Sequence, residues 1–217
     1  MTFPALVIFD LDGTLVDSEP LANRVFYEKL VEAGLDAAID EARVTADFTG
    51  LSLQSCFRHA SEVYGLALPE GFRDVLQAET YARMRRELVP IPGVPALLAG
   101  LTRPRCVASS SELEKIRLSL DLTGLAPHFG AHLFSAEQVQ NGKPAPDLFL
   151  FAAAQLGARP ETCLVVEDSL PGATAGIRAG MQVRAYRPQP SDADEAFAAM
   201  GCVLLRDMQE LAAELAA

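Results

Sequence analysis

The chain has 217 residues, of which half are hydrophobic and 22% are charged, enough apolar material for one large domain or a domain with a smaller insertion. Its net charge of −11 comes from 29 acidic and 18 basic residues. Polyanions are usually bound by clustered lysines and arginines, so this balance argues against a nucleic acid or an anionic membrane as a partner. An anionic small molecule is compatible with it, because a single site can be locally positive on an acidic protein.

Compartment and redox chemistry follow from two further features. The apolar run near the start is too short for a signal peptide, and no run reaches the length of a membrane span. The cysteines are far apart in sequence and form no CxxC pair, which favours reduced, buried thiols over a zinc site or a disulfide framework. We therefore expect a cytoplasmic protein. The four cysteines are Cys56, Cys106, Cys163 and Cys202.

The first predicted element is a buried strand, Leu6–Phe9, which leads directly into Asp10-Leu11-Asp12-Gly13-Thr14. Because a strand alternates its faces with period two, Asp10 and Asp12 should leave its end on roughly the same side. Two carboxylates this close repel each other and stay ionised together only if a cation, hydrogen-bond donors or water compensate them. A hard divalent cation such as magnesium is the simplest compensation. A solvated Asp-Gly turn is the alternative interpretation.

Residues 16–90 are predicted to form a small helical domain. Apolar residues recur there with helical spacing, the breaks fall at glycines and prolines, and no strand-like alternation interrupts the pattern. Short connections between such helices are typical of a bundle. The expected helices cover residues 17–34, 39–48, 51–64 and 70–87.

Beyond Val89-Pro90-Ile91-Pro92-Gly93 the pattern changes to alternating helices and strands. This alternation predicts a parallel sheet with helices on both faces, a Rossmann-like α/β fold. The strand at Leu6–Phe9 belongs to the same sheet, so residues 1–15 and 91–217 form one domain and residues 16–90 are an insertion. The later strands are expected at residues 105–108, 132–134, 163–166, 182–186 and 202–205, and the helices at 94–101, 112–122, 147–156, 170–179, 192–199 and 207–216.

Polar residues follow three of these strands, at the edge where open α/β sheets bind ligands. They are Asp10 and Asp12, then Ser109-Ser110-Ser111, then Glu167-Asp168-Ser169, and Lys143 lies in a loop before a helix. Taken singly, the serines or the acidic segment could simply cap helices, and Lys143 could be a solvated loop residue. Their joint position at one edge favours a common site.

The chemistry that suits these residues is phosphoryl transfer. A carboxylate nucleophile and a phosphate monoester repel each other, and a divalent cation, a lysine and hydroxyl donors remove that barrier. One aspartate can attack phosphorus while a second carboxylic acid protonates the leaving alcohol and later deprotonates water. The residues alone do not decide which of Asp10 and Asp12 takes which part. Asp168 is the natural third metal ligand, supported by Glu167 directly or through water.

Four segments in this order resemble the motifs of the haloacid dehalogenase-like (HAD) hydrolase superfamily, over nearly the whole chain. They are residues 10–19, 107–111, 142–147 and 165–172. The resemblance is to the branch with a helical cap after the first motif, which includes β-phosphoglucomutase and many sugar-phosphate phosphatases. It implies a Mg²⁺ cofactor, a small phosphorylated metabolite as the substrate, and a monomer.

The resemblance also implies roles for single residues. Asp10 is the expected nucleophile, and Asp12 the general acid/base whose main-chain carbonyl also touches the metal. Ser109 and Lys143 are expected to hold the transferring phosphoryl group, and Asp168 to bind the metal with Glu167 nearby. The name-giving dehalogenases lack both the second aspartate and the metal, so Asp12 argues against dehalogenation.

Substrate contacts are expected from the remaining serines and from the cap. Ser110 and Ser111 are candidate donors, Glu19 lies at the hinge into the cap, and Gly50 lies in the cap loop that faces the site in this branch. A further anion contact could come from one of three cap arginines, for which a solvated face is the alternative. These arginines are Arg83, Arg85 and Arg86.

Three functions are consistent with this pattern. We favour a phosphatase acting on a small sugar or polyol phosphate. The alternative enzyme is a hexose-phosphate mutase of the β-phosphoglucomutase type, which carries a basic residue in the cap loop where this chain has Thr49. A catalytically silent binding module on the same fold is the third, although such proteins usually lose a nucleophile, acid or metal ligand, and this chain has them all.

Overall fold

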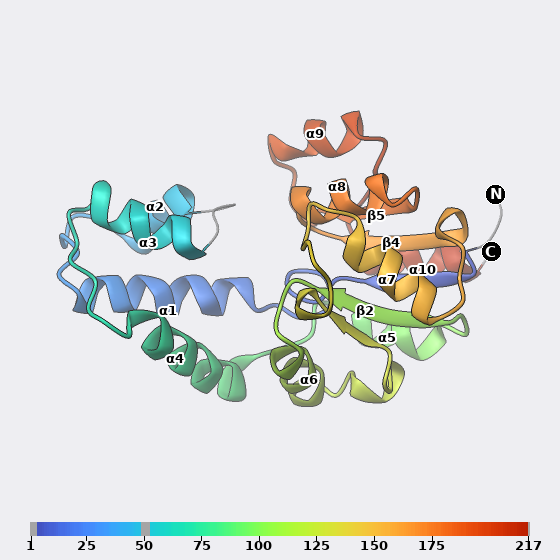
Figure 1. Ribbon diagram of the computed structural model, residues 1–217, viewed down its shortest axis with the longest axis horizontal. Helices are drawn as coiled ribbons and strands as arrows, with labels where there is room; N and C mark the ends of the chain where they lie inside the picture. Colours follow the sequence, from blue (N-terminus) through green and yellow to red (C-terminus); the bar gives the residue numbers. More distant parts are fainter. Residues whose placement is uncertain (1–3, 49–52, 217) are drawn as a thin grey trace. The chain divides into compact units, whose positions relative to one another are not determined.

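The computed structural model describes residues 4–48 and 53–216, which divide into two compact units (Figure 1). The larger unit runs to Asp17 and resumes at Val89, and the smaller unit lies between them. The Asp17 N–H donates to the Val89 carbonyl at 3.0 Å, which ties together the two segments that lead into and out of the smaller unit. The smaller unit thus covers residues 18–88. It is shorter by two residues at each end than the insertion predicted at residues 16–90.

The larger unit is built on a six-stranded sheet in the order β3-β2-β1-β4-β5-β6, and all paired strands are parallel. This confirms the predicted Rossmann-like α/β fold. The strands are β1 (Leu6–Phe9), β2 (Arg105–Ser109), β3 (Leu133–Ser135), β4 (Cys163–Glu167), β5 (Gln182–Tyr186) and β6 (Val203–Leu205).

The register of the central strands explains where their polar ends meet. β1 and β4 are buried along their whole length, as the apolar runs of a two-sided parallel sheet require. Phe9 of β1 is aligned with Val107 of β2 and with Val166 of β4. The chain proceeds from β1 to β2 and β3 on one side, then crosses to β4 on the other. The three polar strand ends therefore meet at the switch point of the sheet, where such folds bind ligands.

Helices cover the sheet of the larger unit. Buried residues of α7 and α8 pack with alternate residues of the central strands, Leu6 and Ile8 among them, in one hydrophobic cluster. All four cysteines of the chain are buried, and none of them forms a disulfide. The helices are α5 (Val94–Gly100), α6 (Leu113–Leu122), α7 (Asp147–Gln155), α8 (Leu170–Arg178), α9 (Ala193–Ala199) and α10 (Met208–Ala216), with 3₁₀ turns at Ala126–His128, Ala136–Gln138 and Pro160–Thr162.

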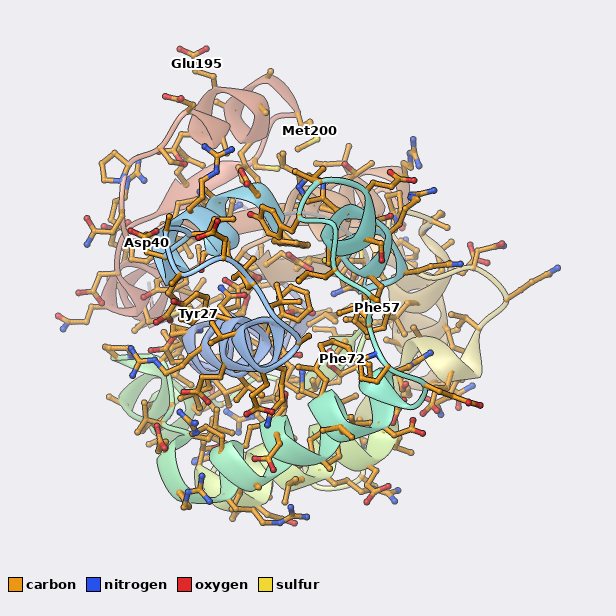
Figure 2. All side chains as sticks on the ribbon, turned by 90° about the vertical axis from the view of Figure 1, so that its left-hand side faces the viewer. Tyr27, Asp40, Phe57, Phe72, Glu195 and Met200 are labelled. Carbon is orange, nitrogen blue, oxygen red and sulfur yellow. The ribbon has the colours of Figure 1, made fainter. Side chains whose placement is uncertain are left out.

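The smaller unit is helical and has its own hydrophobic core. Short helices such as these are marginal in isolation, so packing must hold them. Phe57 and Phe72 lie side by side in this core, with ring centroids 5.5 Å apart and nearly perpendicular planes (Figure 2). Across the described residues no helix combines the length and apolar character needed to cross a membrane. The helices of the smaller unit within residues 18–48 and 53–88 are α1 (Glu19–Glu32), α2 (Glu41–Phe48), α3 (Leu53–Glu62) and α4 (Phe72–Glu87).

Candidate active site

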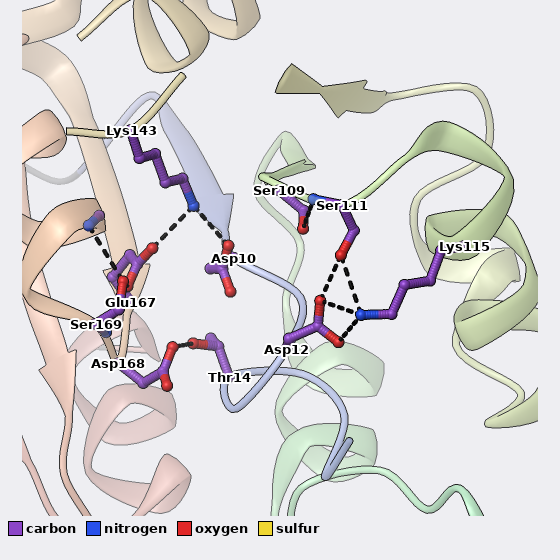
Figure 3. A network of polar contacts seen from close by, with 11 residues as sticks. Asp10, Asp12, Thr14, Ser109, Ser111, Lys115, Lys143, Glu167, Asp168 and Ser169 are labelled. Carbon is purple, nitrogen blue, oxygen red and sulfur yellow. Dashed lines mark hydrogen bonds and ion pairs between the residues drawn. The ribbon is translucent and has the colours of Figure 1, made fainter. Parts of the chain in front are cut away.

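Asp10 lies at the end of β1 and is almost fully buried. The Lys143 ammonium reaches it from the loop before α7, with Nζ 2.5 Å from Asp10 Oδ1 and 2.8 Å from Glu167 Oε1 (Figure 3). Only 4% of the Lys143 side chain is exposed, so this lysine is not a solvated loop residue. Asp10 thus forms a buried trio of two carboxylates and one ammonium with two residues that are more than a hundred positions away from it in sequence.

Glu167 is fixed from its other side by the start of α8. The Ser169 N–H and hydroxyl donate to Glu167 Oε2 at 2.7 and 2.8 Å. The Ser169 hydroxyl also accepts from the Gly172 N–H at 3.1 Å, which caps the helix as the alternative interpretation of this segment expected. Glu167 is 1% exposed, and its carboxylate makes charge-assisted hydrogen bonds to the helix start and to Lys143.

The charges of the trio do not balance. Burial raises the pKa of the Asp10 carboxyl, Lys143 opposes this, and Glu167 and Asp12 add to it, so that the pKa rises to about 7. For Lys143, burial alone would lower the pKa, but the charges of Asp10 and Glu167 outweigh it and the pKa is raised. The lysine therefore stays charged, and full ionisation of Asp10 leaves one buried negative charge uncompensated.

Asp12 has a separate set of partners. Lys115 Nζ, from the first turn of α6, lies 2.8 Å from Asp12 Oδ1 and 2.9 Å from Oδ2. The Ser111 hydroxyl donates to Asp12 Oδ2 at 2.7 Å. Figure 3 shows the Asp12 side chain directed toward Lys115 and Ser111, and the Asp10 side chain directed toward Lys143. One strand end thus carries two aspartates in two different environments.

The serine segment that begins at the last residue of β2 connects to the network of Asp12 through Ser111. Ser109 is buried, and its hydroxyl accepts from the Ser111 N–H at 3.1 Å. The Ser135 hydroxyl donates to the Ser111 carbonyl at 2.7 Å, and Ser110 is exposed. Glu112 is the N-cap residue of α6 and makes no side-chain capping bond, so none of the three serines caps this helix.

Asp168 approaches the turn after β1 because residue 13 is glycine. Gly13 has φ +76°, and a Cβ atom there would overlap the Asp168 carboxylate. The Thr14 hydroxyl donates to Asp168 Oδ1 at 3.2 Å. On the carbonyl side, Arg187 Nη1 donates to the main-chain oxygen of Asp168 at 3.2 Å. The carboxylate of Asp168 is thus fixed beside the turn that carries Asp10 and Asp12.

The donor chemistry at this edge fits a hard divalent cation. The charged groups at this edge that could bind a metal ion are carboxylates, the ligand type that magnesium prefers. In addition, the two carboxylates of Asp10 and Glu167 share one ammonium, so this trio lacks one positive charge. Within the part of the chain that the structure describes, no three His, Cys, Asp or Glu side chains are grouped as around a metal ion. Instead, Asp10 pairs with Lys143, Asp12 with Lys115 and Asp168 with Thr14 (Figure 3).

A family model described as haloacid dehalogenase-like hydrolase matches residues 4–180 of this chain. The chain belongs to this family. It is 35% identical over 185 residues to 6-phosphogluconate phosphatase of Escherichia coli K12, which covers 85% of this chain and 83% of the relative. It is 33% identical to hexitol phosphatase A of the same organism, over 85% of this chain and 83% of the relative.

A solved structure supports the same assignment. The HAD-family hydrolase from Deinococcus radiodurans R1, determined with bound phosphate and sodium, is 34% identical and superposes with a TM-score of 0.83, covering 98% of this chain and 95% of that one. The family assignment confirms the resemblance drawn from the four motifs and makes this chain a hydrolase whose named relatives include phosphatases.

In this HAD-like hydrolase the predicted core residues lie close together. The structure joins Asp10, Lys143 and Glu167 in one network and Asp12 and Ser111 in another. Of the other predicted site residues, Ser109 contacts Ser111, and Asp168 contacts Thr14.

The predicted substrate contacts of the cap stay predictions. Glu19 is exposed in the smaller unit, and Gly50 lies outside the described residues. Arg83 pairs with Glu28 at 2.8 Å within the smaller unit, which favours a structural role for it.

Two site residues were missed by the sequence reasoning, Lys115 and Arg187. A signal existed for Lys115, because it is a cation in the first turn of α6, where the helix dipole disfavours positive charge. It also lies four residues after Ser111, within reach of the same sheet edge. Arg187 follows β5, a strand whose end carries no motif, and no sequence pattern marks it.

Proposed function

We propose that this protein is a Mg²⁺-dependent phosphatase that hydrolyses a small sugar or polyol phosphate through an aspartyl-phosphate intermediate. The observation that carries the proposal is the different pairing of the two aspartates at one strand end. Asp10 is buried against Lys143, and Asp12 is held by Lys115 and Ser111. Carboxylates in such distinct environments are suited to different chemical tasks.

The proposed reaction has two steps. Asp10 attacks phosphorus and the bond to the ester oxygen breaks, while Asp12 gives its proton to the leaving alcohol. Asp12 then takes a proton from a water molecule that attacks the phosphorus, which releases inorganic phosphate and restores Asp10. Lys143 and Ser109 neutralise the oxygens of the transferring group. Glu167 acts through Lys143 by fixing the direction of its ammonium group.

Magnesium fits this site by donor type and by charge. The carboxylates of Asp10 and Asp168 and the main-chain carbonyl of Asp12 would hold it, with Glu167 nearby. When bound, it supplies the positive charge that lets a carboxylate approach a phosphate dianion. The raised pKa of Asp10 in the absence of a cation supports this proposal, because a buried nucleophile must be ionised at neutral pH.

The relatives support a small phosphorylated metabolite as the substrate, since those reported above are phosphatases of a phosphorylated sugar acid and of hexitols. A panel of sugar, sugar-acid and polyol phosphates, read by phosphate release, tests the function. We expect release that requires magnesium, stops with EDTA and is absent in Asp10→Asn. Full activity in EDTA would contradict the metal proposal.

The same panel separates the mutase alternative. β-Glucose 1-phosphate is supplied with a trace of the bisphosphate, and the products are followed. We expect free phosphate or no reaction. Conversion to the 6-phosphate without free phosphate would replace the phosphatase by a mutase.

A further inference from the structure

Lys115 contacts both carboxylate oxygens of Asp12, at 2.8 and 2.9 Å. It also donates to the Ser111 hydroxyl at 3.1 Å, and that hydroxyl donates to Asp12 Oδ2 at 2.7 Å. The three groups form a closed triangle at the start of α6 (Figure 3). Lys115 and Asp12 are each 24% exposed at the side chain, so the triangle is open to solvent on one side.

The position of Lys115 is unfavourable for the helix that carries it. It is the third residue of α6, where the partial positive charge of the helix N-terminus repels a cation. The chain uses lysine sparingly, with three lysines against fifteen arginines, and two of the three contact Asp10 and Asp12. The ammonium of Lys115 is thus placed by its contact with Asp12, and not by any gain to α6.

The other donor of the triangle is rigidly held. The Ser111 N–H donates to the Ser109 hydroxyl, and the Ser111 carbonyl accepts from the Ser135 hydroxyl at 2.7 Å. Ser135 is fully buried at the end of β3. A carboxylate bonded to Ser111 and Lys115 is therefore fixed relative to the sheet edge, whereas an aspartate on a turn would otherwise be free to change rotamer.

We propose that Lys115 is a positioning residue, which with Ser111 holds the carboxyl group of Asp12 in the orientation for proton transfer and directed away from Asp10. This inference rests on the proposed function, in which Asp12 is the acid and base. Lys115 transfers no proton itself. In step one the proton passes from Asp12 to the ester oxygen as the phosphorus–oxygen bond breaks, and in step two it passes from water to Asp12.

The test uses two substrates that differ in their need for an acid. An alkyl phosphate, such as the best substrate of the panel, requires a proton on its leaving alkoxide. p-Nitrophenyl phosphate releases a stable phenolate and requires none in the first step. Since kcat/KM reports the first irreversible step, it isolates the contribution of the acid when the two substrates are compared.

For Lys115→Met we expect kcat/KM to fall about 10- to 100-fold on the alkyl phosphate and by less than about threefold on p-nitrophenyl phosphate, the scale of loss from a displaced catalytic group. We also expect a burst of p-nitrophenol, because the second step needs Asp12 with either substrate. Ser111→Ala removes the other donor and should give the same asymmetry. Lys29→Met, which removes a lysine paired with Glu32 in the smaller unit, is the matched control and should leave both values unchanged.

A double-mutant cycle tests whether Lys115 acts through Asp12. Adding Lys115→Met to Asp12→Asn should cause no further loss on the alkyl phosphate, since the group that is positioned is already gone. An equal loss on both substrates, or an undiminished loss in the Asp12→Asn background, would overturn the inference while leaving the proposed function intact. A wild-type protein inactive on both substrates would overturn the proposed function and the inference with it.

Discussion

Gly172 lies so close to Glu167 that a Cβ atom at residue 172 would overlap the carboxylate of Glu167. Glu167 in turn is the buried partner that directs Lys143 toward Asp10. The absence of one side chain in the first turn of α8 thus sets the direction of the lysine beside the proposed nucleophile.

Gly172→Ala tests this relationship. The residue is helical and has no positive φ, so alanine suits the backbone and would by itself favour the helix by about 0.5–1 kcal/mol. We expect the opposite, a loss of about 1–3 kcal/mol in the free energy of unfolding from overpacking, together with a loss of phosphatase activity. Gly100→Ala is the matched control, because nothing lies within 4 Å of a Cβ there. Equal stability and activity of the two variants would contradict the contact.

Asp10→Asn should stabilise the metal-free protein at pH 8 and do so by less at pH 5. The pKa of Asp10 is raised to about 7 in the folded state, chiefly by burial, from 3.8. The protonated form is thus favoured by folding, and the stability it contributes is present below about pH 4 and lost as the pH rises through 7. Asparagine does not ionise and escapes this loss. Unfolding by urea in EDTA at both pH values measures the difference.

Asp47 offers a control of opposite sign. Its pKa is lowered by hydrogen bonds from Tyr64 and then from Arg43, so its ionised form is the one that folding favours. That stability is present above about pH 4 and lost as the pH falls. Asp47→Asn should therefore give no stabilisation at pH 8, and a gain equal to that of Asp10→Asn would show that the effect has nothing to do with Asp10.

Lys143→Met should destabilise the protein more than any other lysine substitution. It leaves two buried carboxylates without their common partner, and breaking a buried pair in this way costs about 3–5 kcal/mol. The added change Asp10→Asn should recover part of the loss, because it removes one of the two charges. Thermal unfolding at neutral pH compares the stability of the wild type, Lys143→Met and the double variant. Lys29→Met, a loss of a surface pair, should cost no more than about 1 kcal/mol.

Arg187→Met should weaken magnesium binding about 10-fold or more, the range found for groups that orient metal ligands. Arg187 donates to the main-chain oxygen of Asp168 and is itself fixed by Ser191 at 2.7 Å and Asp194 at 3.3 Å. Titration calorimetry with magnesium measures the affinity, and the magnesium dependence of kcat checks it. Arg159→Met removes an exposed arginine paired with Glu161 and should change neither value.

Local sequence patterns were enough to predict the helices and strands and to propose most residues of the candidate site. Runs of apolar residues and their periodicity reflect local burial, so the strand Leu6–Phe9 and the strand Gln182–Tyr186 were placed to the residue. Asp10, Lys143 and Glu167 could be proposed as one site before the structure, because parallel strands bring their carboxyl ends to one edge and because the four motifs occur in a fixed order.

Which side chains meet at that edge could be seen only in the folded chain. Lys115 and Asp12 are 103 residues apart, and their contact depends on the angle of α6 and the turn after β1, which no local pattern encodes. The same holds for Arg187 and Asp168, and for the space that Gly172 leaves to Glu167. The periodicity of a sequence indicates whether a side chain is buried, whereas the partner of that side chain depends on packing between distant segments. Asp10 and Asp12 could therefore be found from the sequence, but their different contacts could not.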